Sequence, residues 1–447
     1  MGPGSREAIE SIVATSVRAY TETLYDPGTP GWKTHIAVGE PYAPRRSLAA
    51  VVLAESLRSG RPELARAIGL DGGVPYDLTP EMAQKIREMT AFYGLSEEDF
   101  GERGATNAGM IALFGKPLFE YAATTRDPAF VAAAERALAR MNSFTVPRGS
   151  QIWEIHMQMP DLYASALCVV ADLWGYRMTG DERYLDEAQR WAATGIPFFY
   201  FWEPERSRLV RSVHVNDGDG EGPILAERRP AQFYEDVRRQ VAPYASIPVF
   251  GTSWYAVTWL GIPVQWCGLA WGNAVRDLDR LRPVPHLVRI ADGAFRSGAN
   301  QQCDASYLAG TLPDSWEISS ATSRQPYIIP DRLLEYAYRV LDLPWVETFQ
   351  HRLIGGAWSH AVSRAALGEP AYDGGTLAIE ARFFEGQRAS AVIVGSAPPA
   401  AVRVDGVEAR DGEDLPSARW LDWGDRGAVL VRWRSGAGPA RIEVVPR

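Results

Sequence analysis

A helix-start motif occurs twice in this chain, 54 residues apart. One copy spans residues 125–136 and the other 179–190, and both fit the pattern T-x-D-x-x-aromatic-aliphatic-x-x-A-x-R. The aspartates of the motif, Asp127 and Asp181, are in the position of helix N-caps, because an apolar stripe with helical spacing follows each of them. A repeat of this length is typical of stacked supersecondary units, so it predicts a series of helix pairs.

The segment before each motif is apolar nearly all round. These segments predict helices over residues 107–124 and 161–178, each buried on both sides, whereas the helices that follow them are amphipathic. The alternation predicts concentric layers, with five or six helix hairpins in residues 6–350. Strands within residues 100–200, or a parallel sheet, would contradict this arrangement. Further helix pairs are expected at 46–58 with 62–69, 254–281 with 285–298, and 328–341 with 345–351.

The periodicity changes to short β-type runs in residues 351–447. Gly, Pro and Asp turns separate runs that are rich in Val, Ile and Ala, which predicts a small antiparallel β-sandwich-like domain. We expect this domain to cover the helical part, and a ligand-binding role is the alternative. The expected strands are 376–383, 389–394, 400–404, 428–433 and 440–445.

The helix-pair repeat resembles the (α/α)6-toroid carbohydrate-active enzymes, such as unsaturated glucuronyl hydrolases and toroidal polysaccharide lyases. Residues 178–188 and the matching segment 124–134 carry the resemblance, which extends over roughly three quarters of the chain. It implies a mainly α fold, an (α/α)5–6 toroid followed by the β-domain. It also implies that the active-site mouth lies where the inner helices begin. No catalytic signature of one family is recognised.

Two inner-helix starts and the loop before the second one hold the first group of candidate site residues. Asn107 and Asp161 are equivalent in the repeat, and free N–H groups and the positive end of the helix dipole gather at such starts. Asp161 has an alternative interpretation as a simple N-cap, and His156 as a hydrogen-bonded structural residue. Glu154 is the better acid, because its apolar neighbour Trp153 raises a carboxyl pKa. Glu154 and Asp161 are catalytic candidates, and Asn107, Trp153, His156 and Tyr163 are substrate-binding candidates.

The second group comes from residues 303–327, which have little periodicity. A connection of this length is often functional. Asp304 and Glu317 are catalytic candidates, and Arg324 could clamp a substrate carboxylate. Asp304 and Asp314 could instead only cap helices. Trp254, Trp266 and Trp316 could stack on a sugar ring, although tryptophans at this spacing also suit a core.

Cofactor and metal signatures are weak. Asp217, Asp219 and Glu221 match the first half of a calcium loop, but Arg228 stands where the twelfth position needs Glu, so a flexible acidic turn is favoured. The six histidines lack zinc-ligand spacing, and the three cysteines are scattered. We therefore expect no cofactor, with calcium as the alternative.

Charge and hydropathy limit the partners. The net charge of −9, without a basic block, disfavours nucleic acid, and no apolar run is long enough to span a bilayer. Residues 1–5 have the composition of a cloning remnant. A signal peptide removed upstream would imply a secreted or periplasmic protein, and a chain without one would be cytoplasmic. The oligomeric state is left open.

The function expected from these residues is glycoside hydrolysis of an oligo- or polysaccharide, with one carboxylic acid and one carboxylate taken from Glu154, Asp161, Asp304 and Glu317. The alternative enzyme is a polysaccharide lyase on a uronate-containing glycan, in which Asn107 or Arg324 neutralises the uronate and His156 or Tyr163 abstracts a proton. A non-catalytic glycan-binding protein and a sugar epimerase or isomerase are the remaining alternatives.

Overall fold

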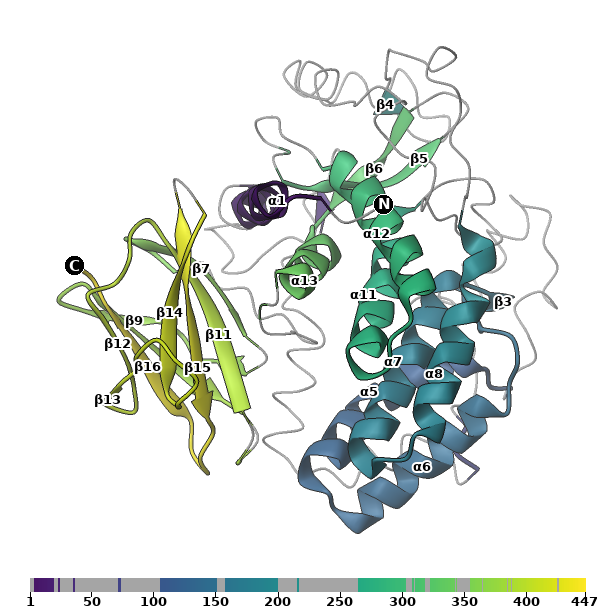
Figure 1. The fold of residues 1–447 in the computed structure, drawn as a ribbon. Helices are drawn as coiled ribbons and strands as arrows, with labels where there is room; N and C mark the ends of the chain where they lie inside the picture. Colours follow the sequence, from purple (N-terminus) through teal and green to yellow (C-terminus); the bar gives the residue numbers. More distant parts are fainter. Residues whose placement is uncertain are drawn as a thin grey trace, which may run out of the picture.

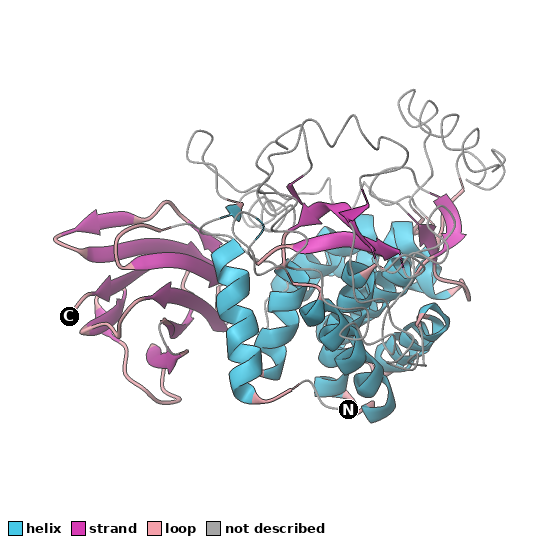
Figure 2. Ribbon diagram, turned by 90° about the horizontal axis from the view of Figure 1, so that it is seen from above, coloured by secondary structure: helices cyan, strands magenta, loops and turns pink. Residues whose placement is uncertain are grey.

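The computed structural model shows a mainly helical protein with antiparallel sheets (Figures 1 and 2). None of the helices it describes is long and apolar enough to cross a membrane. The structure describes residues 4–19, 23–24, 35–36, 71–73, 105–150, 157–199, 215–216, 264–302, 308, 310–317, 322–341, 343, 354–363, 365–383, 385–386, 388–423 and 426–447.

The described helices pair as hairpins. Helices α5, α7, α11 and α13 lie side by side in that order, with α1 next to α13, and helices α6, α8 and α12 pack behind α5, α7 and α11 (Figure 1). One hydrophobic cluster joins them, and α7 is buried nearly all round, as its sequence predicts. The bounds are α1 Arg6–Arg18, α5 Ala108–Thr125, α6 Pro128–Asn142, α7 Leu162–Thr179, α8 Arg183–Thr194, α11 Gln265–Leu281, α12 Pro285–Asn300 and α13 Asp331–Val340, with a 3-10 turn at Ile196–Phe198.

The 54-residue repeat is confirmed in the hairpins α5–α6 and α7–α8. Asn107 and Asp161 are the N-caps of α5 and α7, both in extended backbone, and each side chain accepts a hydrogen bond from the N–H three residues on. Both helices end in a left-handed residue, Arg126 (φ 58°) and Gly180 (φ 75°). This geometry ends the inner helix and turns the chain into the outer one, so the two hairpins have the same local construction.

Short strands cluster near the starts of the inner helices, which corrects three expectations. Strands β2 (Arg148–Ser150) and β3 (Met157–Pro160) form a hairpin before α7, so the prediction that residues 100–200 lack strands is wrong. The segment expected to be aperiodic before α13 contains β5 (Leu312–Glu317) paired with β6 (Thr322–Ile328). Strand β6 also pairs with β1 (His35–Ile36) and, in parallel, with β4 (Val215–Asn216), so the expectation of a fold without parallel strand pairing is wrong as well. These contacts join segments distant in sequence, which local periodicity does not encode.

Two antiparallel sheets form the C-terminal part, and the five predicted runs are all strands in them. The first sheet has the order β14-β15-β11-β7, and the second has the order β13-β12-β16-β10-β8, with β9 on β10. Their facing side chains form one apolar cluster. The bounds are β7 Trp358–Ser363, β8 Ala366–Leu367, β9 Ala371–Asp373, β10 Thr376–Arg382, β11 Arg388–Gly395, β12 Ala401–Val404, β13 Val407–Glu408, β14 Ser417–Asp422, β15 Gly427–Arg434 and β16 Ala440–Val445.

The first sheet is buried on both faces over part of its length. On β11, Ala391 and Ile393 belong to the cluster between the sheets, whereas the alternate residues Val392 and Val394 belong to the cluster of the helical part. Burial on both faces explains why β11 is a continuous apolar run rather than an alternating one. The first C-terminal sheet therefore packs against the helical part.

Some predicted elements lie outside the described residues: the helices at 46–58, 62–69 and 345–351, and the first ten residues of 254–281. Ser5, which the sequence assigns to a cloning remnant, is the N-cap of α1 and accepts a hydrogen bond from Ala8 N at 3.2 Å.

Candidate active site at the inner-helix starts

The starts of α7, α11 and α13 meet at one place in the fold. The ring of Tyr163, in the first turn of α7, makes an edge-to-face contact with Trp266 of α11, with 5.9 Å between centroids. Arg332, in the first turn of α13, donates from Nη2 to the Tyr163 hydroxyl at 3.1 Å, and its guanidinium lies 5.0 Å from the centre of the same ring. Three helix N-termini therefore present their polar ends to a shared region.

Asp161 is the first carboxyl group of this region. Its side chain is fully buried, and its Oδ2 accepts a hydrogen bond from Ala164 N at 3.3 Å. Within the described part of the chain, Oδ1 has no hydrogen-bond partner. Burial raises the pKa of Asp161 to about 7, although the N–H groups of the first turn act in the opposite direction. The residue is thus a helix cap and also an acid that titrates near neutral pH.

Asp314 is the second carboxyl group. It lies on β5, and Gln265 at the start of α11 fixes that strand by donating from Nε2 to the Pro313 carbonyl at 2.6 Å. Burial raises the pKa of Asp314 to about 7, and the side chains of Trp266 and Ser315 lower it in part. Its Oδ2 has no hydrogen-bond partner among the residues that the structure describes. Asp314 therefore has the two properties that mark Asp161.

The pKa of the Cys267 thiol depends on both acids and on Arg332. Burial is the main cause that raises the pKa of Cys267. The charges of Asp161 and Asp314 raise it further, and the charge of Arg332 lowers it. The pKa of Cys267 thus depends on both carboxyl groups and on the guanidinium, so all three contribute to the electrostatic environment of this thiol.

Two buried amide groups at inner-helix starts also have a polar atom without a partner among the described residues. Asn107 is 1% exposed, and its Oδ1 accepts from Met110 N at 2.8 Å, whereas its Nδ2 has no partner in the described ranges. Gln265 Oε1 also has no hydrogen-bond partner among the described residues. A buried amide atom without a partner costs free energy, and a bound hydroxyl would remove that cost.

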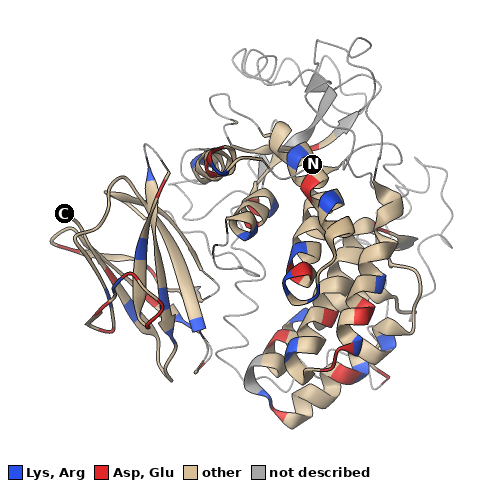
Figure 3. Cartoon of the chain, viewed as in Figure 1, with Lys and Arg blue, Asp and Glu red and all other residues tan. Residues whose placement is uncertain are grey.

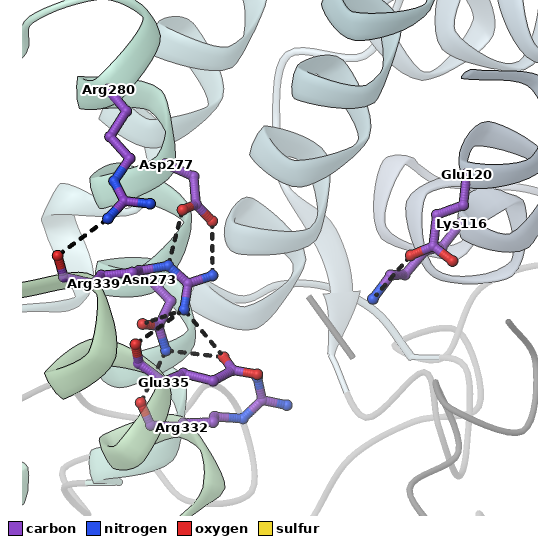
Figure 4. A network of polar contacts seen from close by, with 8 residues as sticks. All are labelled: Lys116, Glu120, Asn273, Asp277, Arg280, Arg332, Glu335 and Arg339. Carbon is purple, nitrogen blue, oxygen red and sulfur yellow. Dashed lines mark hydrogen bonds and ion pairs between the residues drawn. The ribbon is translucent and has the colours of Figure 1, made fainter. Parts of the chain in front are cut away.

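Below the helix starts, a polar network fixes α13 against α11 (Figure 4). Asn273 donates to the Arg332 carbonyl at 2.9 Å and to Glu335 Oε2 at 3.2 Å. Arg339 forms a doubly hydrogen-bonded pair with Asp277, both contacts at 2.8 Å, and both side chains are at most 4% exposed. Removing one partner of such a buried ion pair costs about 3–5 kcal/mol, because the other charge is left uncompensated. The pair therefore sets the position of α13 and hence of Arg332.

The structure describes the side chains of Asn107, Asp161, Tyr163 and Trp266 among the predicted site residues, and it brings the last three together at the starts of α7 and α11. Glu317, Trp316 and Arg324 are described by backbone alone, in the β5–β6 hairpin. Trp153, Glu154, His156, Trp254, Asp304 and the calcium candidates Asp217, Asp219 and Glu221 lie outside the described residues. No group of three or more His, Cys, Asp or Glu that could hold a metal occurs in the part that is described.

Sequence reasoning misses three residues of the site. The sequence suggests a helix cap for Asp314, but this residue lies on a strand. Gln265 and Arg332 belong to no motif, and the available signal is their position within two residues of a helix start.

Comparisons with known proteins concern the fold. No protein-family model and no curated protein matches the sequence. Among solved structures, the chain is similar to a family 76 glycoside hydrolase from a bovine Bacteroides thetaiotaomicron strain (11% identity, 75% of this chain and 77% of that one, TM-score 0.39). It is also similar to the unsaturated glucuronyl hydrolase of Bacillus sp. GL1 (13% identity, 75% of this chain and 95% of that one, TM-score 0.34). A third similar structure is a D-mannose isomerase (12% identity, 75% of this chain and 97% of that one, TM-score 0.33). At these identities and TM-scores, the chemistry must be argued from this chain's own residues.

Proposed function

We propose that this protein is a glycan-active enzyme, and specifically a glycoside hydrolase in which Asp161 and Asp314 form the carboxyl pair. One observation carries the proposal. Burial raises the pKa of two carboxyl groups, Asp161 at the start of α7 and Asp314 on β5, to about 7, both act on the pKa of Cys267, and each keeps an oxygen without a partner among the described residues. The proposal includes a ring of five or six helix hairpins and a sandwich-like β-domain.

The surroundings of the two acids give them different roles. Asp161 lies at a helix N-terminus, where the dipole and the N–H groups favour its charged form, so it is the carboxylate that activates water or attacks the sugar. Asp314 lies on a strand rather than at a helix N-cap, and the apolar ring of Trp266 is beside it, so it is the acid that protonates the leaving oxygen. When two acids titrate near neutral pH, one can hold the proton while the other is charged.

The remaining groups suit a sugar. The rings of Tyr163 and Trp266 offer apolar surface to the C–H face of a pyranose, and the unpartnered amide atoms of Asn107 and Gln265 suit its hydroxyl groups. Glu154, Asp304 and Glu317 remain candidates for the carboxyl pair from the sequence.

A digest of a glycan panel tests the reaction class. Reducing sugar released without the absorbance of a 4,5-unsaturated uronate supports hydrolysis. On the substrate so identified, Asp314→Asn should lower kcat by ~10²–10⁴-fold. Asp172→Asn is the matched control, because Asp172 is also buried with a raised pKa, but it bonds to Asn142 rather than to the site. Equal turnover in both variants would refute the assignment of Asp314.

A polysaccharide lyase is the second candidate, and the Arg332–Tyr163 contact favours it. A guanidinium bonded to a phenol hydroxyl can neutralise a uronate next to the group that abstracts its proton. In that case the digest yields the unsaturated product, and Tyr163→Phe abolishes it while Asp314→Asn does not.

A further inference from the structure

One face of the first C-terminal sheet has two different halves. Toward one end, Val362, Val392 and Leu430 belong to the hydrophobic cluster of the helical part. Toward the other end, the same face continues with arginines, because side chains of one strand alternate between faces. We call the second half the arginine face; it consists of Arg388, Arg419, Arg432 and Arg434.

The strand register places these four arginines next to one another. Arg388 of β11 stands directly opposite Arg434 of β15. Arg432 lies two residues before Arg434 on the same strand, opposite Ser390 on one side and Ser417 on the other. Arg419 is opposite Leu430, diagonal to Arg432. Diagonal neighbours in a sheet are ~7–8 Å apart, so the four side chains form one continuous basic surface.

In the second sheet, two exposed arginines stand opposite carboxylates. Arg403 stands opposite Glu408 and Glu443, and Arg441 stands opposite Glu380. Opposite charges across strands stabilise a sheet, and like charges directly opposite destabilise it. Arg403 and Arg441 of the second sheet thus face carboxylates, whereas Arg388 and Arg434 of the first sheet face each other. Figure 3 colours the charged positions along the ribbon.

The arginine face is open to solvent. Arg388, Arg419 and Arg434 are exposed, and Arg432 is half-buried. Among the described residues none of the four forms an ion pair, although the loop before β14 has three exposed carboxylates at 411–414. Arg434 donates only to the Gly386 carbonyl, at 2.7 Å. This surface costs folding free energy, and an external anion would offset that cost.

We propose that the arginine face binds an acidic polysaccharide through its carboxylate or sulfate groups, and this rests on the proposed glycan-active function. All four cations are arginines, whose planar fork matches a two-oxygen anion better than an ammonium does. They spread over three neighbouring strands of a sheet surface, which suits an extended polymer with repeated charges. In a chain of net charge −9, such a local basic surface also orients the approach of the polymer.

Affinity electrophoresis of the full chain tests this assignment. The gels contain polygalacturonate, heparin, dextran or single-stranded DNA. The carboxylate polymer and the sulfated polymer distinguish the two anion sources, and dextran is the neutral reference. The double variant Arg432→Gln/Arg434→Gln is compared with Arg403→Gln/Arg441→Gln, which removes the same charge from the second sheet.

We expect retardation by at least one acidic polysaccharide, weakened on the order of tenfold by the first pair of changes and less than about twofold by the second. Retardation should fall as salt rises, since the charges are exposed. Equal losses in both double variants would reduce the effect to net charge and overturn the inference, as would tighter retention by DNA or no retention by any polyanion. Because binding is read without turnover, an inactive Asp314→Asn variant that is still retarded separates this inference from the proposed reaction.

Discussion

The starts of α5 and α7 are the same structure with different chemistry. Asn107 and Asp161 are equivalent in the repeat, both are N-caps in extended backbone, and they are 1% and 0% exposed. Each uses one side-chain oxygen to accept an N–H from its own helix, and each leaves its second polar atom without a partner in the described part of the molecule. The amide stays neutral at every pH, whereas burial brings the carboxyl pKa to about 7.

Helix capping and proton transfer place different requirements on the N-cap residue. The cap requires only an acceptor oxygen, which Asn and Asp both supply. A proton that can be gained and lost near neutral pH requires the acid, and the buried setting of α7 tunes it. The repeat therefore explains where Asp161 lies, and its neighbours Tyr163, Cys267 and Arg332 explain what it can do.

The largest expected effect comes from making the start of α7 like that of α5. Asp161→Asn keeps the cap oxygen but removes the titrating proton, so kcat on the identified glycan should fall by ~10²–10⁴-fold. The melting temperature should not fall, because Asn caps as well as Asp. Steady-state kinetics and calorimetry of the same preparation check both. Near-normal turnover would leave Asp161 a cap only, as Asn107 is.

The pH dependence of stability should also distinguish the two starts. The folded-state pKa of Asp161 is raised from 3.8 to about 7, so the folded protein binds more protons than the unfolded chain between these values. Its contribution to stability is therefore fully present below the unfolded value of 3.8 and is lost as the pH rises toward 7.

The Asp161→Asn variant lacks this loss of stability with rising pH, because its amide does not titrate. Its advantage over the wild type in unfolding free energy should grow by about 2–3 kcal/mol between pH 5 and pH 7. Urea unfolding of both proteins at the two pH values measures the difference, and the other buried acids cancel in the comparison. A constant difference would mean that Asp161 is already ionised at pH 5.

The start of α5 should respond without pH dependence. Asn107→Ala removes the acceptor of Met110 N and should cost ~0.5–2 kcal/mol at pH 5 and pH 7 alike. Asn107→Ser is the matched control, since serine restores the cap but not the amide Nδ2. If Asn107 contacts substrate, the serine variant regains the stability that the alanine variant loses, but its KM stays above that of the wild type.

The sequence predicts these starts well because the signal is local. The expected helices at 107–124 and 161–178 are α5 and α7, shifted by one residue, and capping depends on residues within one turn. The β runs at 376–383 and 440–445 are found as β10 and β16 for the same reason. Alternation and helical spacing need no knowledge of the rest of the chain.

The composition of the site is harder to predict, because it depends on distant contacts. Arg332 reaches Tyr163 across 169 positions of sequence, and Gln265 reaches Pro313 across 48. Asp314 shows the limit most clearly. Its strand, LPDSWE, lacks alternation and contains a proline, so it does not have the pattern of a strand. The raised pKa of Asp314 comes from burial, and burial follows from packing.

The smallest expected effect tests whether the repeat extends to the outer helices. Asp127 Oδ1 accepts from Ala129 N and Asp181 Oδ1 accepts from Arg183 N, both at 2.9 Å. Asp127 is the N-cap of α6, whereas Asp181 lies one residue before the N-cap of α8, Glu182, which makes no side-chain cap bond. Asp127→Ala and Asp181→Ala should each cost ~0.5–1 kcal/mol of unfolding free energy, with turnover unchanged. Asp181 also pairs with the exposed Arg183, which adds little in solvent. Costs that differ by more than about 1 kcal/mol would show that the equivalence holds for the inner helices but not for the outer ones.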